Sequence, residues 1–210
     1  MPAAPNTLLR PHDGVEILER DTVFQGYFRI DRYILRFRRF DGSWTAPIMR
    51  EVFERGHAAA VLLYDPARDQ VALAEQFRPG AYAAGWEPWQ VEIVAGIVDE
   101  GETREAAALR EAREEAGTEV AEMIPMLDLI ASPGGASETL RVFLARVDAA
   151  RIAGHHGLEH EAEDIRIHKI SAAEALAWTE QGRIRNAVSV AAIQWLALHK
   201  EEVRKRWGAI

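Results

Sequence analysis

The sequence contains no cysteine among its 210 residues. A disulfide, a thiolate nucleophile and a cysteine-ligated zinc site are therefore excluded. Long apolar runs are absent too, since residues 58–64 form the longest one and a membrane span needs about 20. The first residues, MPAAPNTLLRPHDG, lack the charged start and apolar centre of a secretory signal. We therefore expect a cytoplasmic protein that does not enter a membrane.

Positive charge is also scarce. The chain has 25 Lys and Arg against 33 Asp and Glu, a formal net charge of -8. Proteins that follow a phosphate backbone need an excess of cations, so no nucleic-acid partner is expected. A cluster of five arginines offers an RNA-binding ribbon as an alternative, but interleaved apolar residues and neighbouring acids favour a half-exposed sheet; these are Arg29, Arg32, Arg36, Arg38 and Arg39.

The pattern along the chain predicts more strands than helices. Aromatic and β-branched residues at 23–40, followed by an Asp41-Gly42 hairpin signal, predict two or three strands before Gly56. Six further strands are expected at 57–65, 70–77, 91–95 (with Gly96 ending it), 123–131, 140–147 and 164–170, and helices at 103–116, from Ser171 to near 182, and at 187–207. The elements do not alternate as regular βαβ units, which indicates a mixed α+β layered domain.

The helix predicted at 103–116 ends in an unusual stretch, REAREEAG, at residues 110–117. Glu111, Glu114 and Glu115 fall within an arc of about 100° on one side of such a helix. An exposed helix with i,i+4 ion pairs would account for this charge run. A divalent cation is the other explanation, because crowded carboxylates are hard oxygen ligands. Mg²⁺ suits them better than zinc, which would prefer His or Cys.

The spacing of residues around this stretch favours a bound divalent cation over an exposed helix with ion pairs. Gly96, five residues, Glu102, seven residues, Arg110-Glu111, then Glu114-Glu115 and Gly117 together resemble the Nudix box of nucleoside diphosphate-linked-moiety hydrolases. Two positions depart from the family pattern, since Ala112 and Thr118 stand where an aliphatic residue is usual; neither carries chemistry. The resemblance implies a Nudix-type α/β/α sandwich with a mixed sheet.

The resemblance also implies the metal ligands. Glu111 and Glu115 would be the principal ligands, helped by the backbone carbonyl of Ala95, and Glu114 a further ligand. Arg110 would hold the carboxylates in place. Glu102 would be either a ligand of an additional ion or a structural anchor. Two or three Mg²⁺ or Mn²⁺ ions per site are expected.

Features outside the box resemble the bacterial ADP-ribose pyrophosphatase branch of the family. Pro133 lies sixteen residues after Gly117 in the loop SPGGASE, and FERGHAA, EQFR and SVAAIQWLALH are among the similar segments, which extend over most of the chain. This implies an N-terminal antiparallel β subdomain at 1–56, swapped across a homodimer, and a catalytic domain at 57–210.

The same resemblance suggests substrate contacts. Tyr27, Phe28 and Arg78 would stack on or bind the nucleotide, although core packing explains the first two nearly as well. Arg50 and Glu51 would contact substrate across the dimer, with a surface ion pair as the alternative. Arg78 is the better candidate for a phosphate, because a guanidinium forks onto oxygens. Further contacts are expected from Ile97 at the nucleotide, Glu138 at the terminal ribose, and Pro133.

The segment 153–164 is rich in Gly, His and Glu and would supply the general base. The resemblance indicates Glu161 as the base and Glu163 as a supplementary metal ligand. A solvated acidic loop is the plainer alternative, and His155, His156 and His160 are less favoured candidates for either role. The expected reaction is Mg²⁺-dependent hydrolysis of ADP-ribose to AMP and ribose 5-phosphate. The alternatives are hydrolysis of another nucleotide sugar such as GDP-mannose, or a noncatalytic ADP-ribose sensor.

Overall fold

A computed structural model describes residues 12–152, 154–158 and 162–208. The described chain divides into two compact units, one formed by residues up to 57 together with 130–139, and the other by 58–129 together with 140 onward. Each unit is described by itself below. No helix in the described residues is long and apolar enough to cross a membrane.

The first unit is an antiparallel sheet of three strands, in the order β1-β2-β3. The strands are β1 (Val15–Gln25), β2 (Arg29–Phe37) and β3 (Ile48–Glu54). The expected turn at Asp41-Gly42 lies between β2 and β3, where Gly42 adopts a φ of +86° and Ser43 N–H donates to Asp41 Oδ1 at 2.8 Å. The three strands confirm the prediction for this segment, although β1 begins earlier than the aromatic pattern indicated.

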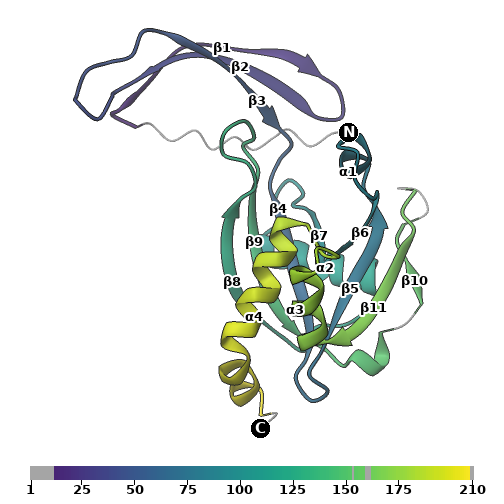
Figure 1. Ribbon diagram of the computed structural model, residues 1–210. Helices are drawn as coiled ribbons and strands as arrows, with labels where there is room; N and C mark the ends of the chain where they lie inside the picture. The colour runs from purple at the N-terminus through teal and green to yellow at the C-terminus, as the bar shows by residue number, and fades with distance from the viewer. Residues whose placement is uncertain (1–11, 153, 159–161, 209–210) are drawn as a thin grey trace. The chain divides into compact units, whose positions relative to one another are not determined.

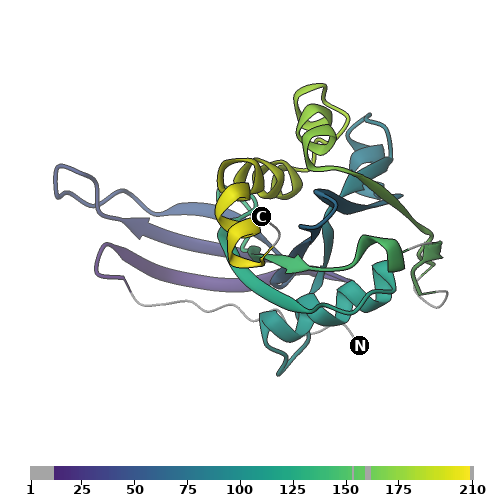
Figure 2. The same ribbon diagram turned by 90° about the horizontal axis from the view of Figure 1, so that it is seen from below.

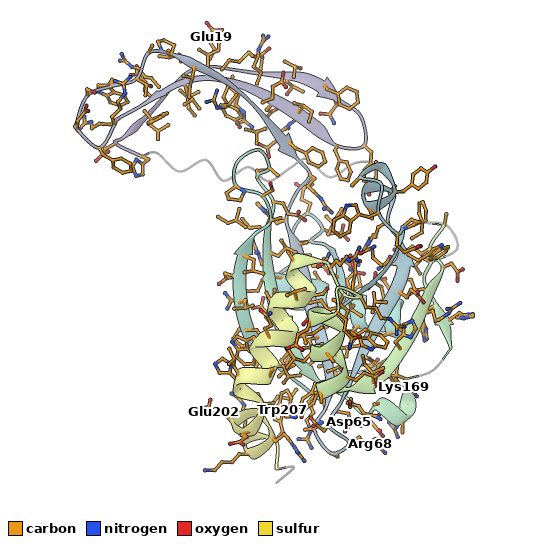
Figure 3. All side chains as sticks on the ribbon, viewed as in Figure 1. Glu19, Asp65, Arg68, Lys169, Glu202 and Trp207 are labelled. Atoms are coloured by element: carbon orange, nitrogen blue, oxygen red, sulfur yellow. The ribbon has the colours of Figure 1, made fainter. Side chains whose placement is uncertain are left out.

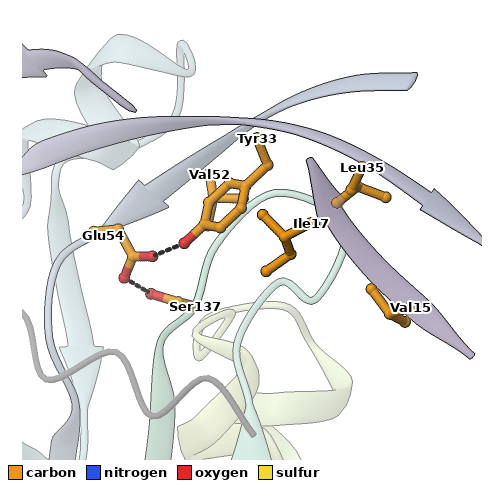
Figure 4. A pocket seen from close by; sticks show the side chains of 7 residues that line it. All are labelled: Val15, Ile17, Tyr33, Leu35, Val52, Glu54 and Ser137. Carbon is orange, nitrogen blue, oxygen red and sulfur yellow. Dashed lines mark hydrogen bonds between the residues drawn. The ribbon is translucent and has the colours of Figure 1, made fainter. Parts of the chain in front are cut away.

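The 130–139 loop belongs to this unit because it is bonded to β3. Phe53 N–H donates to the Gly135 carbonyl at 2.8 Å, and Ser137 N–H donates to the Phe53 carbonyl at 3.2 Å. Beside these bonds the sheet has a pocket of about 230 Å³ (Figure 4). Its polar end is the buried Glu54, which accepts from Tyr33 Oη at 3.4 Å and Ser137 Oγ at 2.5 Å; the aliphatic lining is Val15, Ile17, Leu35 and Val52.

The second unit is built on a mixed sheet in the order β10-β11-β5-β4-β9-β8, with β6 beside β5 and β7 beside β4. The β4 and β9 pair is parallel, while β4 pairs antiparallel with β5 and β7. The strands are β4 (Ala58–Asp65), β5 (Gln70–Phe77), β6 (Trp89–Glu92), β7 (Val94–Ile97), β8 (Glu122–Ile130), β9 (Thr139–Arg146), β10 (His155–His156) and β11 (Ile165–Ser171).

Helices cover both faces of this sheet, as the two views show (Figures 1 and 2). Helix α2 (Arg104–Ala116) packs on one face, and α3 (Ala172–Glu180) and α4 (Ala187–Arg206) pack on the other. Three short elements that the sequence pattern did not indicate are α1 (Pro79–Ala83), a 3₁₀ turn at Ala149–Arg151 and strand β10. The α/β/α sandwich with a mixed sheet confirms the predicted fold class.

Helix α2 has the predicted ends. Thr103 caps its start, because Thr103 Oγ1 accepts from Ala106 N–H at 3.1 Å. Gly117 ends it in the left-handed region at φ +57°, which a residue without Cβ adopts freely. Its sheet-facing side consists of small residues that are completely buried, namely Ala107, Ala108, Ala112 and Ala116. Small side chains let the helix backbone lie close to the sheet, so the carboxylates on its flank reach the sheet's interior.

The prediction of one strand at 91–95 ending at Gly96 is wrong. The segment forms two strands, because β6 pairs with β5 whereas β7 pairs with β4 and continues through Gly96 to Ile97. At the change of partner, Ile93 N–H donates to Ser189 Oγ of helix α4 at 3.0 Å. Where the strand changes partner, the Ile93 amide is therefore hydrogen-bonded by a side chain of helix α4 and not by a neighbouring strand.

The turn after β4 is stabilised by a buried carboxylate, Asp65 (Figure 3). Its oxygens accept from Arg68 Nη1 at 2.7 Å and from the backbone N–H of Ala67, Arg68 and Ala149 at 3.0–3.1 Å. Burial alone would raise the pKa of Asp65, but these hydrogen bonds outweigh it and hold the pKa below its ordinary value. The ionised form is therefore the stabilising one.

Asp65→Asn is expected to lower the free energy of unfolding by about 2 kcal/mol at pH 7, because a charged, multiply bonded acceptor is lost. An unfolded Asp titrates near pH 3.9, and the folded pKa is lower. The difference in unfolding free energy between the variant and the wild type should therefore have its full size above about pH 5 and shrink as the pH falls below about 4. Urea unfolding at pH 7 and pH 3 measures it. Asp148→Asn is the control, since Asp148 pairs with the same arginine but is 48% exposed; an equal loss there would contradict the role of burial.

Candidate active site

Two carboxylates of helix α2 are buried at the sheet. Glu111 is 9% exposed and Glu115 is 2% exposed. Glu115 Oε2 accepts from Ala95 N–H of β7 at 3.2 Å, and Glu115 Oε1 accepts from Gln76 Nε2 of β5 at 3.3 Å. Both partners are neutral donors. The innermost carboxylate is thus fixed in place without a neutralising side-chain bond.

The surroundings of these two acids oppose their ionisation. Burial is the main cause that raises the pKa of Glu115 to about 8, and the nearby Glu111 charge adds to it. Burial also raises the pKa of Glu111 to about 6, with Glu114 and Glu163 adding to the effect and Arg110 opposing it. Two acids that are costly to ionise next to each other form a place where a bound cation would remove that cost.

Gly96 makes room for this arrangement. A Cβ on Gly96 would lie 1.7 Å from Glu111 Oε1 and 2.1 Å from its Cδ. Both separations are far below van der Waals contact, so any side chain at 96 would displace the carboxylate. The glycine of the motif therefore serves close approach between β7 and α2, rather than the strand end that the sequence suggested.

Arg110 connects three acids to the sheet. Its Nη1 donates to Glu111 Oε1 at 2.6 Å and Glu114 Oε2 at 3.0 Å, while Nε and Nη2 both reach Glu102 at 3.1 Å. Nη2 also donates to the Ile97 carbonyl at 3.0 Å. The bonds to Glu102 are the main cause that raises the pKa of Arg110 above its ordinary value. In this structure Glu102 acts as an anchor for the arginine.

Arg110→Lys is expected to weaken the binding of a divalent cation at these acids about 10-fold or more, because a lysine ammonium cannot span the acids and the Ile97 carbonyl at once. Glu111 and Glu114 would lose the donor that they share. Titration calorimetry with a divalent cation measures the effect. Arg113→Lys on the same helix is the control, because among the described residues the side chain of Arg113 pairs only with the exposed Glu119. Equal effects of the two variants would contradict the bracing role.

Arg78 lies at the end of β5 and is held by Glu92 of β6. Arg78 Nε donates to Glu92 Oε2 at 2.7 Å, with the arginine side chain 38% exposed and the glutamate side chain 7% exposed. The positive charge of Arg78 is close enough to Glu115 to lower that residue's pKa. A guanidinium is thereby placed beside the acidic pair, where an anionic ligand bound to a cation would meet it.

The donor set suits a hard divalent cation. Glu111 and Glu115 offer carboxylate oxygens, and burial raises the pKa of both, so a bound cation would favour their ionised forms. Among the residues that the structure describes, no three acidic or histidine side chains converge as a finished cage. Mg²⁺ does not need one, because it keeps several waters and takes one or two carboxylates plus substrate oxygens.

Several predicted contacts lie in the first unit. Tyr27 is 73% exposed, so core packing does not describe it, while Phe28 packs edge-on against Phe53 at 5.1 Å between ring centroids. Arg50 and Glu51 are exposed on β3. Pro133 lies in the loop bonded to β3, and Glu138 is buried and paired with Arg55 at 3.1 Å. Burial raises the pKa of Glu138 against the opposing charge of Arg55.

The proposed base, Glu161, lies outside the described residues, as does His160. Glu163 is described, and its Oε2 accepts from Leu158 N–H at 3.3 Å. Its charge acts on Glu111. His155 and His156 form β10 beside β11, and the His156 ring lies against Gly117, where a Cβ would be 2.5 Å from His156 Cε1. Glu163 and helix α2 therefore lie close together.

Sequence reasoning missed three residues of this site. Gln76 bonds to Glu115, Glu92 holds Arg78, and Asn186 Nδ2 donates to Glu92 Oε1 at 2.8 Å. The polar Glu92 at the end of an apolar strand was the one signal available, because a charge in a buried strand requires a partner.

The layered fold and the buried Glu111 and Glu115 pair, with Arg110 and Arg78 beside it, suit a protein that binds a divalent cation and an anionic ligand. The chain belongs to the NUDIX domain family, which it matches over residues 54–200. It is 48% identical to the ADP-ribose pyrophosphatase of Escherichia coli strain K12, over 93% of this chain and 94% of that protein.

More distant relatives agree with this family. The ADP-ribose pyrophosphatase of Haemophilus influenzae is 38% identical over 92% of this chain and 90% of its own length. The GDP-mannose pyrophosphatase of Pectobacterium atrosepticum is 32% identical over 86% of this chain and 92% of its own length. The fold also resembles the crystal structure of an ADP compounds hydrolase, with a TM-score of 0.69 and 20% identity over 96% of this chain and 100% of that one.

Proposed function

We propose that this protein hydrolyses the diphosphate of ADP-ribose to AMP and ribose 5-phosphate with Mg²⁺ as its cofactor. The observation that carries the proposal is the buried Glu111 and Glu115 pair, because burial raises the pKa of both acids and a bound cation would offset the cost of ionising them. The relatives named ADP-ribose pyrophosphatase at 48% and 38% identity support the choice of substrate.

Glu111 and Glu115 would hold the metal, with Glu114, Glu163 and the carbonyl of Ala95 as further ligands for two or three ions. Bound Mg²⁺, or Mn²⁺ in its place, supplies charge neutralisation of the diphosphate and a lower pKa for the attacking water. Arg110 would hold Glu111 and Glu114 in place, and Gln76 with the Ala95 amide would hold Glu115.

The remaining steps fall to polar side chains around the acids. Arg78 would bind diphosphate oxygens and stabilise the charge that develops on them. Glu161 remains our candidate for the base that takes a proton from the attacking water. Ile97 would border the nucleotide, and its carbonyl is already fixed by Arg110.

Further residues would recognise the two ends of the substrate. Tyr27 and Phe28 offer aromatic faces for the adenine, and Glu138 and Pro133 would border the terminal ribose. Arg50 and Glu51 would act on the partner's substrate in a cytoplasmic homodimer with swapped N-terminal subdomains, residues 1–56 against a catalytic domain of 57–210. The exposure of Tyr27 on the β1-β2 turn supports a role in contact with another molecule.

A substrate panel tests the assignment. With Mg²⁺ present, kcat/KM for ADP-ribose is expected to exceed that for GDP-mannose and other nucleotide sugars by about 10-fold or more, because one well-matched base contact is worth that much. Hydrolysis of GDP-mannose is the second candidate, supported by the relative at 32% identity. A preference for GDP-mannose would overturn the substrate and keep the hydrolase. Tight ADP-ribose binding without turnover would indicate the sensor instead.

A further inference from the structure

The end of β6 and the start of helix α4 form a closed set of hydrogen bonds that none of the metal or substrate roles above explains. Asn186 is the N-cap of α4, and Asn186 Oδ1 accepts from Ser189 N–H at 3.0 Å and Ser189 Oγ at 3.1 Å. Ser189 Oγ accepts in turn from Ile93 N–H at 3.0 Å. Asn186 Nδ2 points the other way and donates to Glu92 at 2.8 Å. One side chain therefore caps the helix and grips a buried carboxylate.

Glu92 links Asn186 to Arg78. One oxygen of Glu92 accepts from Asn186 Nδ2, and the other accepts from Arg78 Nε at 2.7 Å. Glu92 is 5% exposed and Ser189 is completely buried, so the set is shielded from water and its bonds are stronger than surface bonds. The charge-assisted bond to Glu92 uses the Nε–H of Arg78 and leaves its two terminal NH₂ groups unused.

The two terminal nitrogens of Arg78 remain able to bind a ligand. A guanidinium has five N–H groups in a fixed fork, and only the single Nε–H is taken by Glu92. In the described part of the chain, neither terminal nitrogen of Arg78 makes a side-chain bond to another residue, and the side chain is 38% exposed. The backbone is fixed as well, because Arg78 N–H donates to the Pro88 carbonyl at 2.8 Å.

We propose that Asn186 and Glu92 are positioning residues that aim the terminal nitrogens of Arg78 at the substrate diphosphate. The proposal rests on the function proposed above. It gives the first turn of α4, which packs on the opposite face of the sheet from α2, a part in substrate binding. The two roles of Asn186 are separable, because capping uses Oδ1 and positioning uses Nδ2.

The substitution Asn186→Ser separates the capping role of Asn186 from its role in positioning Arg78. Serine caps a helix about as well as asparagine, but it lacks the amide that reaches Glu92. We expect kcat/KM for ADP-ribose to fall about 10-fold, the cost of one bond to a charged group. Both a higher KM and a lower kcat should contribute to the fall, because Arg78 would bind the diphosphate and stabilise the charge that develops on it. The midpoint of thermal unfolding should stay within about 2 °C of the wild type.

Ser171→Ala is the matched control. Ser171 caps α3 by accepting from Glu174 N–H at 3.1 Å, and it belongs to neither the Asn186 nor the Arg78 set. This variant should lower the unfolding midpoint and leave kcat/KM unchanged. Glu92→Gln is the second test variant, since it keeps the shape of the side chain and removes its charge; it should raise KM at least as much as Asn186→Ser.

A readout without turnover completes the test. The Nε–H resonance of Arg78 in ¹H–¹⁵N spectra, identified by its loss in Arg78→Lys, should exchange with water about 10-fold faster in Asn186→Ser than in the wild type. An unchanged exchange rate, or an unchanged kcat/KM in both test variants, would overturn the proposal. If the wild type fails to cleave ADP-ribose, the proposed function falls, and the exchange rate still decides whether Asn186 positions Arg78.

Discussion

Replacing Glu115 with glutamine is expected to lower kcat at least about 100-fold, as is typical when a group that organises metal catalysis is lost. Glutamine keeps the size of the side chain and the bond that Ala95 N–H donates at 3.2 Å. It removes the charge that would hold Mg²⁺. The KM for ADP-ribose should change less than kcat, because the substrate also has Arg78 and the metal bound at Glu111.

The same variant is expected to be more stable than the wild type in the presence of a chelator. Without metal, ionising Glu115 is costly, since burial and Glu111 raise its pKa to about 8 from near 4.3 in an unfolded chain. A raised pKa for an acid means that stability falls as the pH rises between these values. Glu115→Gln should therefore match the wild type near pH 4 and exceed it at pH 8, with a midpoint about 2–8 °C higher.

Glu105→Gln is the control for both measurements. Glu105 lies on the same helix and is exposed in its first turn. It should change neither kcat nor the pH dependence of unfolding appreciably. Near wild-type turnover of Glu115→Gln would refute the ligand role of Glu115. A loss of stability at pH 8 would contradict the account of its burial.

Gly96→Ala is expected to abolish most activity while leaving the fold intact. The new methyl group would occupy the place of the Glu111 carboxylate, 1.7 Å from its Oε1. The φ angle of Gly96 is not in the left-handed region, so the backbone accepts alanine without strain. The side chain of Glu111 must move away. We expect a loss of about 100-fold in kcat, comparable with removing a metal ligand.

Titration calorimetry with Mg²⁺ measures the cause directly, since the variant should bind the ion much more weakly than the wild type. Gly80→Ala in α1 is the matched control, because a Cβ there meets no atom within 4 Å. It should have wild-type affinity and equal or slightly higher stability, because alanine favours a helix. Wild-type Mg²⁺ affinity in Gly96→Ala would show that the glycine is not needed for the metal site.

Local signals in the sequence predicted helix α2 well. Gly117 marks its end, because a glycine stop depends on adjacent residues alone. The alanines that precede it show which side faces the sheet. The crowding of Glu111, Glu114 and Glu115 follows from helical geometry, so the candidate site could be named before its surroundings were known.

Contacts between distant segments could not be predicted in this way. Glu92 and Asn186 are 94 positions apart, and their bond depends on where β6 and α4 meet across the fold. The break at Ile93 has the same origin, because β6 and β7 pair with different strands. The strand was predicted to end at Gly96 because glycine usually weakens strands. Its closeness to Glu111 is visible only once β7 and α2 are packed.

The most direct test of the central claim is to follow ADP-ribose with the purified protein after chelation and after Mg²⁺ is restored. Chromatography of the products gives their identity and ratio. The account predicts no turnover after chelation, and AMP with ribose 5-phosphate in equal amounts once Mg²⁺ returns. Turnover that is unaffected by removing divalent ions would contradict it, and so would intact ADP-ribose in the presence of Mg²⁺.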